Sequence, residues 1–295
     1  MRATNLAIQT DLGEWNWAIP RPDSGTAVRI IFLQFPRYTV FMPVQDPTQR
    51  FSSRVENYVR YRPGYPPAVI DLLKNECALT RDAVIADVAS GTGIFTRMLL
   101  ENGNRVFGVE PNAAMRKAGE QFLSAYPRFT SIVGTAEATT LDDHSIDFVT
   151  AAQAAHWFDR GKTRPEFVRI LKPGGLIVLL WNERCIDSTP FLRDYEQLLL
   201  AYGSDYQNVR HERTVAEIET FFRPSQFQLR TFEHQQEFDY RGLEGRLLSS
   251  SYTPEPEDAR YASMLRELRR LFDMHQVNGR VTFEYKTRVY YCPLS

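Results

Sequence analysis

The chain has 295 residues, 43% of them hydrophobic, so it is long enough to bury the core of one large domain or two small ones. Its 35 Lys and Arg balance 36 Asp and Glu, and the formal charge of -1 gives no overall field that would attract DNA or RNA. The three cysteines, Cys77, Cys185 and Cys292, form no CxxC pair, which argues against a disulfide framework or a zinc site and fits a reducing cytoplasm.

Residues 1–45 show no periodic pattern of apolar residues and are predicted to form an irregular N-terminal extension. Asp11 and Glu14 stand where a signal peptide would place its basic and apolar regions, and charged residues interrupt the apolar stretch 26–44. Neither a signal peptide nor a membrane helix is therefore indicated. Because the recognisable elements begin after Met42, we expect the residues before it to lie upstream of the natural start. A disordered arm or an edge strand is the alternative.

From residue 66 onward, helical spacings of apolar residues alternate with short apolar runs that are typical of buried strands. Strands that alternate with helices at this spacing imply an α/β fold with a parallel, doubly wound sheet. In chain order, the pattern predicts a helix at 66–75, a strand at 84–88, a helix at 94–102, a strand at 105–109, a helix at 113–125, strands at 129–133 and 146–152, a helix at 164–171, a turn at 173–175 and a strand at 176–181.

Beyond residue 181 the pattern changes to helices followed by longer strands. Residues 46–295 are expected to form one domain, with a helical lid or insertion near 183–225 and 241–276. The predicted elements are helices at 191–202 and 215–222, a strand at 227–238, an amphipathic helix at 258–275 and an antiparallel, half-exposed strand at 281–290.

A glycine-rich turn follows the first of these strands, at the edge where open parallel sheets bind ligands. The turn contains Gly91 and Gly93 but lacks the third glycine of a dinucleotide-binding turn, because Thr96 stands at that position, which argues against a nicotinamide-dependent oxidoreductase. Asp87 would repel a pyrophosphate but accepts hydrogen bonds from an ammonium group, and Glu110 is placed to accept both hydroxyls of a ribose. The pair predicts a ligand that joins a nucleoside to a zwitterionic amino acid. A helix cap at Asp87 and a solvated loop acid at Glu110 are the structural alternatives.

Four motifs in the same order resemble those of class I S-adenosylmethionine-dependent methyltransferases, at 87–96, 109–111, 134–137 and 171–175. The sequences YRPGYP and AQAAHWFD are similar to segments of small-molecule methyltransferases such as trans-aconitate methyltransferase. The resemblance covers residues 46–182. It implies a Rossmann-like sheet of seven strands with the last strand antiparallel, a helical insertion after the fifth strand, and S-adenosyl-L-methionine as the methyl donor.

The cofactor-binding residues implied by these motifs include two departures from the usual pattern. Ser90 stands where such enzymes usually carry glycine, which is tolerable if Ser90 needs no positive φ. Thr135 stands where an aspartate often receives the adenine amino group, so adenine recognition is expected to move to Glu137 or to the amide of Ala136. The segment 58–62 is expected to cover the cofactor or, alternatively, to pack on the core as an aromatic helix. The full expected set is Tyr61, Arg62, Asp87, Ser90, Gly91, Gly93, Glu110, Ala136, Glu137 and Gln153.

His156 follows the fourth strand, at the edge of the sheet where the reactive methyl group is expected to lie. We predict that it lines the acceptor pocket, which Trp157 helps to close, and that it is the general base if the acceptor is a hydroxyl. A carboxylate acceptor needs no base, and a structural histidine is the alternative. The acceptor is expected to be a small molecule, a carboxylate or a hydroxyl compound, and Arg62, Arg160 or Arg184 would neutralise an anionic one. No cluster of metal-ligating residues is evident, so no metal is expected.

Three other functions are alternatives to this one. The near-zero charge disfavours a methyltransferase that acts on nucleic acid, as does the lack of an Asn-Pro-Pro-Tyr type segment after the fourth strand, and a protein methyltransferase is a further alternative. A regulatory protein that binds S-adenosylmethionine without catalysis would carry the same motifs. We expect a cytoplasmic monomer or weak dimer that engages neither nucleic acid nor a membrane.

Overall fold

The computed structural model describes residues 54–294 except 205, 207–217, 219 and 224. These residues belong to the second of the two units into which the chain divides, residues 44–295. The expectations for residues 1–45 and for half of the predicted helix at 215–222 therefore lie outside the described residues, while residues 218 and 220–222 of that segment are helical.

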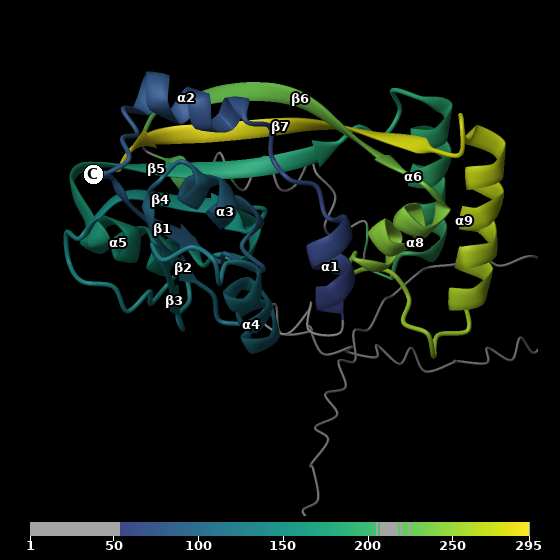
Figure 1. Cartoon of the computed structure of the whole chain (residues 1–295), viewed down its shortest axis with the longest axis horizontal. Helices are drawn as coiled ribbons and strands as arrows, with labels where there is room; N and C mark the ends of the chain where they lie inside the picture. The colour runs from purple at the N-terminus through teal and green to yellow at the C-terminus, as the bar shows by residue number, and fades with distance from the viewer. Residues whose placement is uncertain (1–53, 205, 207–217, 219, 224, 295) are drawn as a thin grey trace, which may run out of the picture. The chain divides into compact units, whose positions relative to one another are not determined.

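A seven-stranded mixed sheet with the order β3-β2-β1-β4-β5-β7-β6 forms the centre of this unit (Figure 1). Strands β1 to β5 are parallel, while β7 is antiparallel to both β5 and β6. This topology confirms the predicted Rossmann-like sheet with an antiparallel last strand. The strands are β1 (Val84–Val88), β2 (Arg105–Val109), β3 (Phe129–Ile132), β4 (Ile146–Ala152), β5 (Leu171–Arg184), β6 (Gln228–Phe238) and β7 (Val281–Pro293).

Two apolar clusters cover opposite faces of the parallel strands. Successive residues of a strand point to opposite faces, so Ile85 of β1 belongs to one cluster and Ala86 and Val88 to the other, all with no exposed surface. Helices α2 (Ala68–Cys77) and α3 (Ile94–Glu101) contribute to the first cluster, and α5 (Arg160–Ile170) contributes to the second. Burial on both faces explains why β1 appears in the sequence as a continuous apolar run.

Strands β5, β6 and β7 continue beyond the parallel part of the sheet and carry a separate helical layer. Its helices, α6 (Pro190–Tyr202), α8 (Tyr240–Leu248) and α9 (Tyr261–His275), pack with the extended strands around a third buried cluster that includes Leu192, Leu268 and Phe283. Figure 1 shows these helices at the far end of the long strands from α2 and α5. Helix α6 begins the predicted insertion after the fifth strand.

Helix α1 (Val55–Tyr61) contacts both α8 in the helical layer and α4 (Ala113–Phe122) beside the parallel strands (Figure 1). None of its residues is buried. The preceding residue, Arg54, is buried and donates hydrogen bonds to the carbonyl oxygens of Leu248, Ser250 and Thr253 at 3.1, 2.7 and 2.6 Å. Specific polar contacts therefore hold the start of α1 in place, while Tyr61 at its other end packs against the buried cluster of the helical layer.

Two elements differ from their predicted bounds for identifiable reasons. The helix predicted at 164–171 begins one turn earlier, because Asp159 caps it by accepting a hydrogen bond from Gly161 N at 3.0 Å. The turn predicted at 173–175 lies within β5, where the pairing with β4 shifts in register and Gly174 has a φ of 79°. Among the helices described, none combines the length and the apolar character that crossing a membrane would need.

Candidate active site

The turn after β1 depends on residues with a left-handed backbone. Gly91 and Gly93 have φ values of 58° and 83°, and Ala89 has a φ of 54°. Ser90 is not among these residues, so its departure from glycine creates no strain. Ala89 instead carries the conformational cost, on the order of 1–2 kcal/mol, that a glycine would avoid. A side chain at Gly93 would be strained by the positive φ and would place its Cβ 2.6 Å from Leu123 Cδ1, so both the backbone and the packing favour glycine here.

Glu110 joins the end of β2 to the glycine turn. Its Oε2 accepts a hydrogen bond from Gly91 N and its Oε1 accepts one from Asn112 N, both at 2.8 Å. Burial raises the pKa of Glu110, although the two backbone N–H groups and Arg116 partly offset the shift. Each carboxylate oxygen keeps a second lone pair. Glu110 can therefore accept further hydrogen bonds from a ligand in the cavity that it lines.

Asp87 stands buried at the end of β1 between two threonines. Its Oδ2 accepts a hydrogen bond from Thr96 Oγ1 at 2.5 Å, and its Oδ1 accepts one from Thr150 Oγ1 at 2.8 Å. Burial raises the pKa of Asp87 to about 6, although the threonine hydroxyls counter the shift. Thr96 stands where a dinucleotide-binding turn would have its third glycine. In this protein its hydroxyl group holds the Asp87 carboxylate in place. Thr150 belongs to the neighbouring strand β4, so the motif alone does not reveal it.

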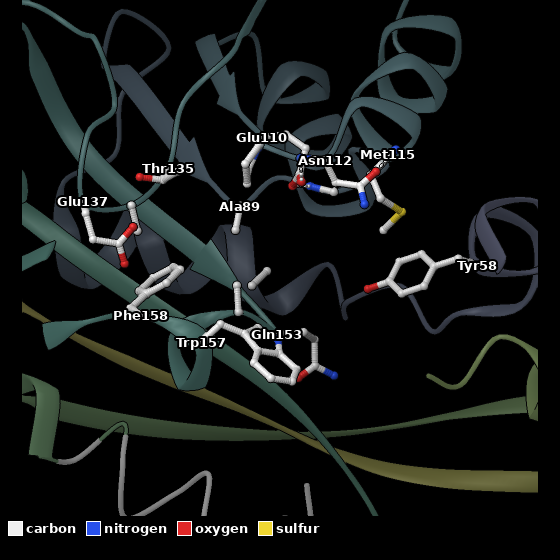
Figure 2. A pocket seen from close by; sticks show the side chains of 15 residues that line it. Tyr58, Ala89, Glu110, Asn112, Met115, Thr135, Glu137, Gln153, Trp157 and Phe158 are labelled. Carbon is white, nitrogen blue, oxygen red and sulfur yellow. Dashed lines mark hydrogen bonds between the residues drawn. The ribbon is translucent and has the colours of Figure 1, made fainter. Parts of the chain in front are cut away.

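A cavity of about 280 Å³, here called the main cavity, lies at the carboxyl ends of β1, β2 and β4 (Figure 2). Figure 2 shows Tyr58 reaching toward it from α1, on the side opposite Glu137 and Phe158. Asn112 shapes its rim by capping α4, since Asn112 Oδ1 accepts hydrogen bonds from the first backbone N–H groups of that helix. Its lining includes Tyr58, Ala89, Gly91, Glu110, Met115, Thr135, Ala136, Glu137, Gln153, Trp157 and Phe158.

A smaller cavity of about 40 Å³, the adjoining cavity, lies beside the glycine turn and is lined by Asp87, Thr92, Arg62 and Tyr65 among others. Thr92 Oγ1 and Arg62 Nε are buried, and neither has a hydrogen-bond partner within the described part of the chain. Buried donors are normally satisfied. Two unsatisfied donors beside a carboxylate complement the carboxylate and ammonium groups of an amino acid, so this cavity fits the zwitterionic end of the cofactor that the motifs imply.

A third cavity of about 160 Å³, the arginine cavity, extends toward the helical layer and is lined by Arg62, Arg184 and Arg246. Tyr58 and Gln153 line this cavity and also the other two. The three cavities therefore meet at one tyrosine from α1 and one glutamine at the end of β4.

The three arginines of this cavity differ in their partners. Arg184 Nη2 lies 2.5 Å from Glu196 Oε2. Arg62 and Arg246 donate only to neutral carbonyl and hydroxyl oxygens, and neither forms an ion pair with any residue that the structure describes. Arg160, also expected from the sequence, donates to a backbone carbonyl instead and lines none of these three cavities. The cavity thus holds two cations whose charge an anion would neutralise.

Gln153 is held in an uncommon backbone conformation where the cavities meet. Its φ is 60°, and its side-chain amide exchanges two hydrogen bonds of 3.2 Å with the backbone of Asn182. The Asn182 side chain donates to Gly64 O at 2.9 Å and accepts from Thr287 Oγ1 at 2.6 Å. This network joins β4, β5 and β7 to the segment after α1. Gln153 is among the predicted residues, whereas Asn182 is not, because only the folded sheet brings β5 beside it.

His156 occupies a short 3-10 turn, Ala155–Trp157, just after β4. The centroid of its ring lies 4.3 Å from that of Trp157 and 5.0 Å from that of Trp181. All three rings line the arginine cavity, and Trp157 also lines the main cavity. The structure therefore places His156 where a base or a shape-determining residue for the acceptor would stand, and its role stays a prediction.

The remaining expected residues occupy different places. Ala136 and Glu137 line the main cavity, and Glu137 Oε1 accepts a hydrogen bond from Asp159 N at 3.0 Å. Tyr61 lines none of the three cavities. It packs instead against Gly245, where an added Cβ would lie 2.0 Å from Tyr61 Cε2. Of the aromatic residues of α1, the structure brings Tyr58 to the site.

Comparison with known proteins places this site in a family. Residues 86–179 match the family model described as a methyltransferase domain. An uncharacterized methyltransferase of Mycobacterium tuberculosis is 36% identical over 173 residues, which cover 59% of this chain and 67% of that protein. An uncharacterized methyltransferase-like protein of Schizosaccharomyces pombe is 30% identical over 165 residues, which cover 56% of this chain and 63% of that protein.

Solved structures show the same fold. A protein assigned as a type II methyltransferase from Anaeromyxobacter dehalogenans has a TM-score of 0.60 at 23% identity, over 79% of this chain and 98% of that chain. A protein assigned as a methyltransferase of an antibiotic biosynthesis pathway from Anabaena variabilis has a TM-score of 0.56 at 21% identity, over 80% and 100% of the two chains. With the motifs, the domain match and the mycobacterial relative, the chain belongs to the class I S-adenosylmethionine-dependent methyltransferases.

Proposed function

We propose that this methyltransferase methylates an oxygen atom of a small organic acid that binds in the arginine cavity. The observation that carries the proposal is the meeting of the three cavities at Tyr58 and Gln153. A donor in the main and adjoining cavities would share these two residues with an acceptor in the arginine cavity. Orientation of two reactants in this way contributes about 7–11 kcal/mol toward lowering a reaction barrier.

The main cavity offers contacts for the nucleoside part of S-adenosylmethionine. The free lone pairs of Glu110 would accept hydrogen bonds from the ribose hydroxyls. Glu137 and the backbone amide of Ala136 would meet the adenine, since Thr135 has no carboxylate. Gln153 would lie near the point where the cofactor faces the acceptor.

The adjoining cavity offers contacts for the amino-acid part of the cofactor. Asp87 would accept from the ammonium group, while Arg62 and Thr92 would donate to the carboxylate. The backbone of the turn at 90–93 permits close approach because its glycines carry no side chain. Tyr61 would not contact the cofactor; by packing against Gly245 it would fix the end of α1, which Arg62 directly follows. When bound, this cofactor supplies a methyl group activated by its positive sulfur.

The charges of the arginine cavity support an anionic acceptor. Arg184 pairs with Glu196, and Glu183, which also lines this cavity, pairs with Arg288, whereas Arg62 and Arg246 form no ion pair with any described carboxylate. Unpaired charges in a buried site are costly, so a site that binds an anion gains more from them than a site for a neutral ligand. The volume of about 160 Å³ suits a small molecule. A small carboxylic acid meets both conditions.

A hydroxyl group on such an acid is the second candidate for the atom that is methylated. The position of His156 beside Gln153 favours it, because a hydroxyl must lose its proton to attack the methyl group. A carboxylate is already deprotonated at neutral pH and needs no base. For a carboxylate, the aromatic rings around His156 would shape the cavity and exclude water.

The test is transfer of a labelled methyl group to acids and to their neutral amides, for example succinate against succinamide and benzoate against benzamide, with salicylate as a hydroxy acid. We expect label in the acids and little in the amides. Treatment of the products with base then identifies the oxygen, since a methyl ester releases labelled methanol and a methyl ether does not. Equal labelling of acids and amides, or label confined to macromolecules, would contradict the proposal.

A further inference from the structure

Helix α1 links the cofactor side of the site to the acceptor side. Its Tyr58 lines all three cavities, and Arg62, which follows its last residue, lines the adjoining and arginine cavities. Figure 2 shows Tyr58 directed from α1 toward the main cavity. Any change in how firmly α1 is seated therefore reaches both ligands.

The two ends of α1 are attached to one turn of the helical layer, residues 249–253. Before the helix, Arg54 donates to the carbonyl oxygens of Ser250 and Thr253. After the helix, Arg62 Nη2 donates to Ser249 O at 2.9 Å. The polar attachment of the Arg62 end to this turn is thus one hydrogen bond from a guanidinium group, beside the packing of Tyr61 against Gly245, and the buried Nε of the same group has no partner within the described residues.

Arg246 of α8 reaches the same turn and adds a second positive charge there. Its Nη1 donates to Ser250 Oγ and its Nε to Tyr285 OH, both at 3.3 Å, and the residue is 6% exposed. Burial and the charge of Arg246 both lower the pKa of Arg62, so the two guanidinium groups repel each other. No described carboxylate pairs with either group, whereas Arg54 and Arg184 in the surrounding structure each pair with a glutamate.

We propose that Arg246 is a positioning residue that makes cofactor binding depend on the acceptor. Its charge opposes the seating of Arg62, and with it the seating of α1 and Tyr58. An anion bound in the arginine cavity between the two guanidinium groups removes that opposition and closes α1 over the cofactor. The inference rests on the proposed acid acceptor, and it makes binding of the two ligands cooperative, with the same factor in both directions.

The test is calorimetric titration of S-adenosylhomocysteine into the full chain, without acid and with sodium citrate, sodium succinate or sodium phosphate at an ionic strength matched with sodium chloride. For the parent we expect at least one of these anions to lower the Kd about tenfold. Arg246→Met should bind S-adenosylhomocysteine about tenfold more tightly than the parent without acid and should not respond to any of the anions. Arg246→Lys keeps the charge and should keep the response.

Two controls separate this role from a merely structural one. Arg184→Met should lower the melting temperature, because it leaves Glu196 without its cation, whereas Arg246→Met breaks no ion pair and should lower it less. Hydrogen exchange of the amides at 55–61 should slow in Arg246→Met and in the parent with the effective anion. Arg246→Gln serves as a second neutral variant if Arg246→Met does not fold.

The affinity for S-adenosylhomocysteine tests the coupling, and methylation of acids tests the proposed function, so either can fail without the other. Methylation of acids with the same S-adenosylhomocysteine affinity in parent, Arg246→Met and Arg246→Gln would overturn the coupling and leave the function intact. Tighter binding in the neutral variants without methylation of any acid would support the coupling and contradict the function. Neutral variants that bind no more tightly than the parent overturn the inference whether or not any anion binds.

Discussion

Glu110 connects two backbone segments through one carboxylate, since it accepts from Gly91 N and from Asn112 N. Glu110→Gln would turn an amide N–H₂ group toward one of these two donors, so the glycine turn and the cavity rim would separate. We expect the affinity for S-adenosylhomocysteine to fall by about tenfold or more, as befits loss of a charge-assisted hydrogen bond. The measurement is calorimetry on folded protein.

Glu120→Gln is the matched control for this change. Glu120 lies on α4, and its side chain is 47% exposed. This variant should bind like the parent. Parent-like binding by Glu110→Gln as well would show that the acid does not hold the cofactor.

Asp87 gives the site a pH dependence of predictable sign. Its pKa is raised in the folded state from 3.8 to about 6, so the folded protein holds this proton more firmly than the unfolded chain does. The resulting stability is fully present below about pH 4 and is lost as the pH rises through about 6, with a change on the order of 2–3 kcal/mol. Asp87→Asn has no proton to lose at this position, so its stability should not fall over this pH range. The melting temperature of this variant relative to the parent should therefore rise between pH 4 and pH 7, while S-adenosylhomocysteine binding weakens about tenfold or more.

Asp71→Asn on the exposed side of α2 provides the comparison for this pH series. Its melting temperature should follow that of the parent at every pH. A constant difference between Asp87→Asn and the parent from pH 4 to pH 7 would show that Asp87 titrates normally in the folded protein.

His156 distinguishes the two acceptor atoms. If a carboxylate is methylated, His156→Gln should keep kcat within about threefold, because no base is needed and the ring only shapes the cavity. If a hydroxyl is methylated, the same change should lower kcat by about 10²–10⁴-fold. In both cases, His156→Gln should leave the affinity for S-adenosylhomocysteine unchanged. Parallel loss of turnover and affinity would make the residue structural.

At the scale of single residues, the sequence located the donor side of the site better than the acceptor side. Asp87 and Glu110 follow strands whose burial is evident from their apolar runs, so their placement at one edge of the sheet was predictable. Arg246 and Asn182 come from elements outside the recognisable motifs, and only the long-range pairing of β4, β5 and β7 brings Asn182 to Gln153. Ala89 was not expected to have a positive φ, because alanine rarely does.

At the scale of elements, strands were predicted most closely and short polar helices least. The bounds of β1, β2 and β4 agree with their apolar runs, because both faces of these strands are buried. Helix α1 has only seven residues, so the helical spacing of Val55, Tyr58 and Val59 is too short to be recognised as a periodicity, and none of its residues is buried. Helix α8 lies in the helical lid or insertion expected near 241–276 but had no predicted bounds of its own, although Asp239 caps it by accepting from Gly242 N at 2.7 Å.

Helix α1 yields a prediction at this scale. Arg54→Met removes the hydrogen bonds that attach the start of the helix to the turn at 249–253, each worth about 1 kcal/mol. We expect α1 to loosen, the Kd for S-adenosylhomocysteine to rise about tenfold, and the melting temperature to fall. Arg60→Met, on the exposed side of the same helix, should leave both unchanged. Parent-like affinity in Arg54→Met would mean that α1 does not cover the cofactor.

At the scale of the whole described unit, the long strands β5 and β7 run from the parallel part of the sheet to the helical layer, so the proposed donor and acceptor sites are built on one continuous sheet (Figure 1). Composition could not reveal the acceptor side. The formal charge of -1 excludes a global attraction for polyanions, yet Arg62 and Arg246 concentrate positive charge in one cavity. A local field of this kind arises from folding, because the two residues lie far apart in the sequence.

A crystal structure with S-adenosylhomocysteine and an acid from the transfer screen tests most directly whether the three cavities hold donor and acceptor side by side. We expect adenosine in the main cavity with its ribose on Glu110, the amino-acid end at Asp87 and Thr92, and the sulfur facing the arginine cavity near Gln153. The carboxylate of the acid should contact Arg246. A sulfur atom directed away from the arginine cavity, or an acid bound elsewhere on the protein, would contradict the account.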